Sequence, residues 1–251
     1  MIIQVIGLPG SGKTTFAKEF SSRINAIHLN ADEIRSDLNK DLGFTEEDRI
    51  EHARRLGALS KLLANQGHHV VVDFVNPTEK TRKAFGTPDK VIWMRRKPTR
   101  DFPDTTAMWE MPKNVDLGFD EMLTLENCVR AAIVDFRLHD WRQPTTLMLG
   151  RYQPWHEGHH ALYKEAGQRT EQVMLGVRDT YQTSEKDPLN FEQVKYYIAK
   201  DPVMERAMIV KMPNITNIVY GRDVGYKIEQ VKLEDSIESI SATQKRKEMG
   251  I

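Results

Sequence analysis

The sequence has almost no cysteine, no net charge and no long apolar run. Its 251 residues include one cysteine, Cys128, which excludes an internal disulfide and suits a reducing compartment. The 36 basic and 36 acidic side chains cancel, so composition gives no support for a nucleic-acid or anionic-membrane partner. No window approaches 18 apolar residues, and the first residues lack the features of a signal peptide. We therefore expect a cytoplasmic protein without nucleic-acid or membrane partners, and self-association into a homo-oligomer stays open.

A glycine-rich loop follows the first apolar segment. Residues 2–6 are typical of a buried parallel strand, and GLPGSGKT at 7–14 matches G-x-x-x-x-G-K-[ST] in full. The backbone N–H groups of such a loop, with the start of the following helix, bind phosphates. Lys13 is expected to reach the β- and γ-phosphates of ATP, and Thr14 to offer a hydroxyl to Mg²⁺. The predicted nucleotide-binding residues here are Gly7, Gly10, Ser11, Gly12, Lys13, Thr14 and Thr15.

Strand and helix patterns alternate through the first half. The predicted elements are strands at 26–30, 68–75 and 89–96, a long helix at 46–67 and a closing helix at 124–141. This alternation predicts an α/β fold in which a parallel sheet carries helices on both faces. Ligands of such sheets bind beyond the carboxyl ends of the strands. The candidate residues at these ends are Asp32 and Arg35, then Asp73 to Asn76, and then Arg95 and Arg96.

The stretch from residue 29 to 83 resembles the adenylylsulfate kinase family. That family reads D-G-D-x-x-R, then L-G-F-[ST]-x-x-D-R-x-x-[NH]-x-R-R, then F-[IV]-[SN]-P, and this chain has NADEIR, LGFTEEDRIEHARR and FVNP. The resemblance implies an ATP-dependent kinase that phosphorylates a small-molecule hydroxyl. It implies that Lys13 and Asp32 are catalytic, and that Asp32 and Thr14 order Mg²⁺. The substrate-binding residues that it implies are Arg35, Phe44, Arg49, His52, Phe74, Asn76 and Pro77.

The chain departs from that family at several points. Asn30 replaces the first carboxylate, His52 stands where asparagine is usual, and Asn76 replaces a serine. The family's long lid is missing, and only residues 95–112 fill its place. They still hold three arginines and one lysine, which predicts a cationic cover for phosphates; for Arg95, Arg96 and Arg100 a solvated charge run is the other interpretation. Adenylylsulfate as the acceptor therefore stays open.

The pattern restarts after a polar segment that ends at Pro144. We place a boundary there, which gives domains at 1–144 and 145–251. The predicted elements of the second domain are strands at 145–150, 171–177, 207–212 and 216–221 and helices at 156–169 and 190–200. They predict a small Rossmann-like domain with a parallel sheet.

Three histidines lie between a strand and a helix in GRYQPWHEGHHAL, residues 150–162. H-x-x-H alone supplies two zinc ligands and no Cys/His cluster follows, so anion binding at a helix start is the favoured interpretation. The segment resembles the G-[RT]-[FY]-x-P-x-H-x-G-H signature of the nucleotidylyltransferase superfamily, which includes nicotinamide-mononucleotide adenylyltransferases and cytidylyltransferases. ISATQKR at 240–246 resembles the I-S-x-T-x-x-R signature of the same superfamily.

These two signatures imply transfer of a nucleotidyl group from ATP or CTP to a phosphate-type acceptor, with release of pyrophosphate. His156, His159 and Arg246 would be catalytic, since they would meet the charge that develops on the phosphates. The nucleotide-binding residues that the resemblance implies are Gly150, Arg151, Tyr152, His156, His159, Gly221, Asp223, Ser241, Thr243 and Arg246.

The whole chain therefore predicts a bifunctional transferase, a kinase followed by a nucleotidylyltransferase. Two alternatives stay open. One is a sulfate-activation enzyme that makes 3′-phosphorylated adenylylsulfate, and the other is a non-catalytic nucleotide-sensing module in which Asn30 and Asn76 mark lost activity. An RNA-end-processing kinase is disfavoured, because the chain lacks both net positive charge and an aromatic–basic stripe.

Overall fold

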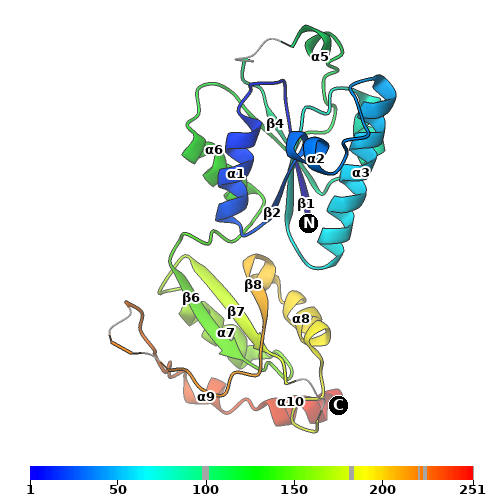
Figure 1. The fold of residues 1–251 in the computed structure, drawn as a ribbon. Coiled ribbons are helices and arrows are strands. Elements are labelled where there is room, and N and C mark those ends of the chain that lie inside the picture. Colours follow the sequence, from blue (N-terminus) through cyan, green and yellow to red (C-terminus); the bar gives the residue numbers. More distant parts are fainter. Residues whose placement is uncertain (98–101, 181–183, 220, 223–224, 251) are drawn as a thin grey trace. The chain divides into compact units, whose positions relative to one another are not determined.

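The computed structural model describes residues 1–97, 102–180, 184–219, 221–222 and 225–250 (Figure 1). The chain divides into two compact units, Met1–Trp141 and Arg142–Ile251, and we describe each by itself. This division lies three residues before the boundary predicted at residue 144. Among the described residues, no helix has the length and apolar character that crossing a bilayer requires.

The first unit contains a five-stranded, fully parallel sheet in the order β2-β3-β1-β4-β5. Its strands are β1 (Ile2–Ile6), β2 (Ile27–Asn30), β3 (Val70–Asp73), β4 (Lys90–Met94) and β5 (Leu117–Phe119). The register pairs Asn30 on β2 with Asp73 on β3, so the last residues of these neighbouring strands lie side by side. The predicted parallel sheet is confirmed, and β5 is an addition that the sequence did not suggest.

Helices cover both faces of this sheet, as predicted, and the valine run of β3 explains why both faces need cover. Val71 belongs to a core with Phe16 and Val129, whereas Val70 and Val72 belong to a second core on the other face. A strand buried on both faces is apolar at every position. The helices of this unit are α1 (Lys13–Arg23), α2 (Ala31–Asp37), α3 (Glu46–Asn65), α4 (Glu79–Phe85), α5 (Pro103–Ala107) and α6 (Leu125–Asp135).

The long helix α3 packs unusually closely against the end of α4. A Cβ atom built on Gly57 would lie 1.9 Å from the backbone oxygen of Phe85, so only glycine fits there. Helix α3 begins at the side chain of Thr45, which accepts a hydrogen bond from the Asp48 amide. This packing fixes the helix whose first turns carry Arg49 and His52.

The second unit contains a three-stranded parallel sheet in the order β6-β7-β8. Its core combines Met148 and Leu175 from the sheet with Val194 and Ile198 from a helix. Its elements are β6 (Thr145–Gly150), α7 (Glu157–Ala166), β7 (Gln172–Arg178), α8 (Phe191–Ala199), a 3-10 helix η1 (Pro202–Arg206), β8 (Met208–Met212), α9 (Asp235–Glu238) and α10 (Ala242–Met249). The first five elements predicted for this half are confirmed.

The strand predicted at 216–221 is wrong. The described residues between Met212 and Tyr220 form no strand, and Tyr220 itself lies outside the described residues. Ile218 and Val219 are 58% and 88% exposed, so they have no core to pack against. Branched side chains favour strands only where they pack on neighbours, and here that condition fails.

Candidate functional site

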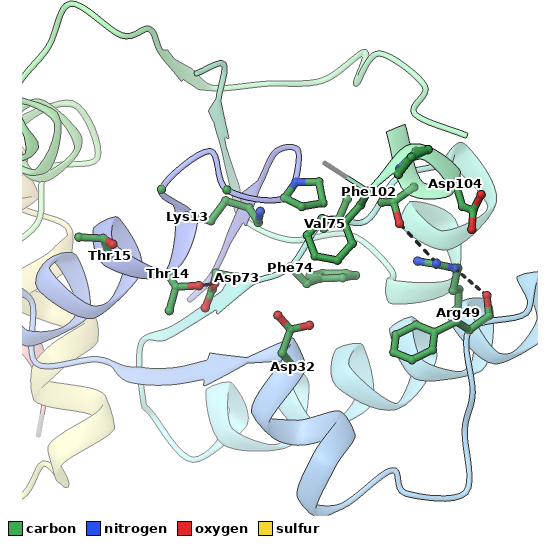
Figure 2. Close-up of a pocket in the computed structure, with 16 residues that line it drawn as sticks. Lys13, Thr14, Thr15, Asp32, Arg49, Asp73, Phe74, Val75, Phe102 and Asp104 are labelled. Atoms are coloured by element: carbon green, nitrogen blue, oxygen red, sulfur yellow. Dashed lines mark hydrogen bonds between the residues drawn. The ribbon is translucent and has the colours of Figure 1, made fainter. Parts of the chain in front are cut away.

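The glycine-rich loop lies between β1 and α1 at the edge of a cavity of about 780 Å³ (Figure 2). Gly7 has φ +151°, and a Cβ there would lie 2.6 Å from the Met94 backbone oxygen, so this loop can turn only with glycine. Of the predicted nucleotide-binding residues, Gly10, Gly12, Lys13, Thr14 and Thr15 line the cavity, whereas Gly7 and Ser11 do not.

Lys13 is the cation of this loop. Its Nζ donates a hydrogen bond to the Leu8 backbone oxygen at 2.8 Å. Burial lowers the pKa of Lys13 to about 8, and the nearby carboxylates of Asp73 and Asp32 oppose that effect. An anionic ligand in the cavity would therefore favour the charged form of Lys13.

Three aspartates line the cavity, Asp32, Asp73 and Asp104, and two of them lie at the ends or starts of elements next to the glycine-rich loop (Figure 2). Asp32 stands on α2, is exposed, and makes no hydrogen bond or ion pair with any residue that the structure describes. Asp73 ends β3 and is buried; its Oδ2 accepts a hydrogen bond from the Thr14 hydroxyl at 2.7 Å. Asp73 was a strand-end candidate without an assigned role, and its contact with Thr14 could not be seen in the sequence.

The far end of the cavity holds an exposed aromatic ring beside cations. Phe44 is 69% exposed, and the guanidinium carbons of Arg35 and Arg49 lie 5.0 and 5.6 Å from its ring centre. Arg49 donates to the Phe44 backbone oxygen at 2.9 Å and to the Thr105 hydroxyl at 3.5 Å. Of the residues implied for the substrate, three line the cavity: Phe44, Arg49 and Phe74. The sequence did not single out four further lining residues, Phe102, Pro103, Asp104 and Thr105.

The other residues implied for the substrate, Arg35, His52, Asn76 and Pro77, do not line the cavity. His52 is buried with its Nδ1 at 2.9 Å from the Asn39 amide nitrogen, and burial, together with the charge of Arg35, lowers the pKa of His52 to about 4. Asn76 is fully buried at φ +47°. These two side chains are therefore buried inside the unit and do not form the surface of the cavity.

The residues that replace the long lid divide between two surroundings. Arg95 forms an ion pair with Asp120 at 3.0 Å, and both side chains are exposed. This contact agrees with the interpretation of Arg95 as part of a solvated charge run. Arg96 donates to the Leu123 backbone oxygen at 2.7 Å, and its guanidinium comes within 3.8 Å of a Cβ built on Gly12. Arg96 therefore lies beside the glycine loop, and Arg100 lies outside the described residues.

Known proteins are similar to the first unit of the chain, which contains this cavity. The family model for adenylylsulphate kinase matches residues 1–88. The adenylyl-sulfate kinase of Clostridium kluyveri is 30% identical over 165 residues, which are 54% of this chain and 82% of that protein. The chain belongs to the adenylyl-sulfate kinase family.

Other relatives in this family match a shorter region. A probable adenylyl-sulfate kinase of Bacillus subtilis and the bifunctional enzyme NodQ of Rhizobium meliloti are each 41% identical over 87 residues, 33% of this chain. The chain spans 44% of the first of these proteins and 14% of the second. The adenylyl-sulfate kinase likeness thus lies in the first unit.

A second, smaller pocket of about 140 Å³ lies in the second unit, outside the part that carries the adenylyl-sulfate kinase match. The two signatures predicted there meet at this pocket. Its lining residues are Arg151, Tyr152, Gln153, His159, Lys186, Ala242 and Arg246. Lys186 was not singled out from the sequence, because it lies in a loop with no recognisable motif.

His159 lines this pocket and stacks on His156, which is not among the lining residues. The rings of His156 and His159 have centroids 3.8 Å apart, and His156 begins α7 by accepting a hydrogen bond from the Gly158 amide at 3.1 Å. Burial, and next the charge of His156, lower the pKa of His159 to about 3. The Nδ1 atom of His160 instead lies 2.6 Å from the carboxylate of Asp201, the residue that caps η1, so this contact connects α7 to the start of η1.

Helix α10 brings the second signature to the same place. Ser241 begins this helix by accepting a hydrogen bond from the Gln244 amide at 3.1 Å. Arg246 donates to the Gln153 backbone oxygen at 2.7 Å and to the Thr243 hydroxyl at 3.1 Å. The chain therefore places a guanidinium beside His159 although the two residues are far apart in sequence.

The remaining residues implied for this nucleotide fall into three groups. Tyr152 is buried and donates to the Met148 backbone oxygen at 2.7 Å, and Gly150 allows its ring to come close. Gly221 is exposed and is not among the lining residues. Asp223 lies outside the described residues. Within the described ranges, no group of three or more His, Cys, Asp or Glu side chains is arranged to hold a metal ion.

Proposed function

We propose that the first unit is an ATP-dependent kinase that phosphorylates a hydroxyl of a small molecule. One observation carries this proposal: a phosphate-binding loop with Lys13, a free carboxylate at Asp32 and a buried carboxylate at Asp73 face one cavity. Phosphoryl transfer needs little covalent chemistry from the protein, so positioning and charge stabilisation suffice.

The kinase step follows from these groups. Lys13 and the loop amides bind the β- and γ-phosphates. The oxygen of the acceptor hydroxyl bonds to the γ-phosphorus, and Asp32 accepts the proton of that hydroxyl. The bond from that phosphorus to the bridging oxygen breaks, and ADP leaves. Mg²⁺ suits this site, because the Thr14 hydroxyl and a carboxylate offer the hard oxygen ligands that it prefers. When bound, Mg²⁺ supplies positive charge against the phosphates.

The acceptor end suits a molecule with an aromatic group and a negative charge. The exposed ring of Phe44 offers a stacking surface, and the guanidinium of Arg49 places a positive charge beside that ring. Adenylylsulfate has both properties, and the relatives' names support it as an acceptor. In place of the family's long lid, the short segment 95–112 contributes Phe102 and Asp104 to the cavity. The experiment below therefore includes acceptors other than adenylylsulfate.

We infer for the second unit a nucleotidylyltransferase that uses ATP or CTP. In this reaction an acceptor phosphate oxygen attacks the α-phosphorus, the α–β bridge breaks, and pyrophosphate leaves without a covalent enzyme intermediate. His159 would meet the charge that develops on the α-phosphate, and Arg246 the charge on pyrophosphate. The proposal is supported by the meeting of His159 and Arg246 in one pocket, where Lys186 adds positive charge and Arg151 is paired with the carboxylate of Asp187.

The deciding experiment is incubation of the full chain with Mg²⁺ and either ATP or CTP, and a panel of hydroxyl and phosphate metabolites. ADP formation that depends on a hydroxyl acceptor and pyrophosphate release that depends on a phosphate acceptor are the expected results. Formation of 3′-phosphorylated adenylylsulfate from adenylylsulfate would favour sulfate activation. Stoichiometric nucleotide binding without turnover of any acceptor would favour a sensing module and contradict the proposal.

A further inference from the structure

The hydroxyl of Thr14 is paired with a carboxylate from β3, not with one from β2. Asp73 is 2% exposed, and one oxygen, Oδ2, accepts from Thr14 at 2.7 Å. Its other oxygen, Oδ1, is held by the ring Nε2 of His28. Asp73, the last residue of β3, is therefore contacted by His28 from β2 and by Thr14 from the start of α1.

Asn30 explains how this arrangement is held. It is the register partner of Asp73, and its amide nitrogen lies 3.1 and 3.2 Å from the two carboxylate oxygens. The same nitrogen donates to the Thr14 hydroxyl at 3.2 Å, and the amide oxygen accepts from the Glu33 backbone at the start of α2. A carboxylate at position 30, where the resembled pattern has one, would stand about 3 Å from that of Asp73 and the two charges would repel.

The position of Asp32 separates it from this cluster. Its side chain faces the cavity from α2 and makes no hydrogen bond or ion pair with the described residues, so it is free to meet an acceptor. Mg²⁺ in phosphate sites is held by one or two carboxylates together with phosphate oxygens and water. A carboxylate fixed beside the loop hydroxyl fits that role better than one that is exposed and unsupported.

We propose that Asp73 at the end of β3, and not Asp32 on α2, orders Mg²⁺ with Thr14, that Asn30 positions Asp73, and that Asp32 is left for the acceptor proton. This rests on the proposed kinase function of the first unit. It differs from the assignment implied by the family resemblance, in which Asp32 shares the metal. The three side chains thus divide the work between metal and acceptor.

The test is the effect of Mg²⁺ on ATP binding to the full chain, measured by calorimetry without any acceptor. The ratio of ATP affinities with and without Mg²⁺ should fall at least about tenfold in Asp73→Asn and by a similar factor in Asn30→Ala, as for changes around other metal sites. In Asp32→Asn the ratio should stay near the wild-type value. Binding of Mn²⁺ with ATP, followed by electron paramagnetic resonance, gives a second readout that does not require turnover.

The two carboxylate variants are matched, because each replaces one cavity-lining aspartate by its amide. An unchanged Mg²⁺ effect in folded Asp73→Asn, or its loss in Asp32→Asn, would overturn this assignment alone. If Asp73→Asn does not fold, Asp32→Asn decides: retention of the Mg²⁺ effect supports the assignment and loss overturns it. A wild-type chain that binds no ATP with or without Mg²⁺ would overturn the kinase proposal itself.

Discussion

Asp32 is the proposed proton acceptor of the kinase, because its exposed carboxylate lines the cavity and makes no hydrogen bond or ion pair with the described residues. We expect Asp32→Asn to lower phosphoryl transfer by about 10² to 10⁴-fold, the usual contribution of a general base. ATP affinity should change little, since Lys13 and the loop amides remain. Steady-state rates together with calorimetric ATP binding check this, and a rate near that of the wild type would move the proton acceptor to another group.

His159 is the residue whose environment most favours its neutral form. The pKa of His159 is lowered to about 3, first by burial and then by His156. The unfolded chain binds this proton near the ordinary pKa of 6.5, so the contribution of His159 to stability is present above that pH and is lost as pH falls toward 3. We expect one histidine ring, absent from the spectrum of His159→Gln, to show no titration between pH 8 and 4.5 by nuclear magnetic resonance. A midpoint near 6.5 for that ring would contradict the buried placement.

At the scale of elements, the contact between α3 and α4 depends on one missing side chain. Alanine normally stabilises a helix relative to glycine by about 1 kcal/mol. At Gly57 a methyl group would overlap the Phe85 backbone, so Gly57→Ala should instead destabilise the first unit by about 1–3 kcal/mol. Denaturant unfolding measures the change. Ala58→Gly, on the exposed side of the same helix, is the control and should destabilise by about 1 kcal/mol through helix propensity alone. A stabilised Gly57→Ala chain would show that the helices can separate at little cost.

Elements with a clear apolar pattern were predictable from the sequence, and elements without one were not. The valine run of β3 and the apolar spacing of α3 identify a strand and a helix, because both have faces to bury. The three-residue β5 and the short helices α2, α4 and α5 carry too few residues for a period to appear. The prediction of a strand at 216–221 was wrong, because β-branched side chains favour a strand only where they pack against a core, and those of Ile218 and Val219 are exposed.

The site shows the same division between local pattern and long-range contact. The loop that holds Lys13 follows from local spacing, and the strand-end rule placed Asp32 and Asp73 near one edge. The hydrogen bond from Thr14 to Asp73 spans 59 positions, and the contact between His52 and Asn39 spans 13, so no local motif predicts either of them. Tertiary contacts of this kind decide which of several strand-end side chains faces the ligand.

At the scale of the whole molecule, each of the two units has its own parallel sheet and its own loop between a strand and a helix. The adenylyl-sulfate kinase match lies in the first unit, and the His159–Arg246 pocket lies in the second. A kinase forms a phosphate ester, and a nucleotidylyltransferase of the proposed kind consumes a phosphate. We propose that the two units catalyse consecutive reactions on one small molecule.

The most direct measurement compares both activities in the wild-type chain, Lys13→Ala and His159→Ala, with folding of each checked by circular dichroism. We predict that Lys13→Ala abolishes phosphoryl transfer and keeps pyrophosphate release largely intact. His159→Ala should lower pyrophosphate release by about 10² to 10³-fold, the usual effect of losing one such donor, and keep phosphoryl transfer. Equal loss of both activities in folded Lys13→Ala, or full pyrophosphate release by His159→Ala, would contradict two independent sites.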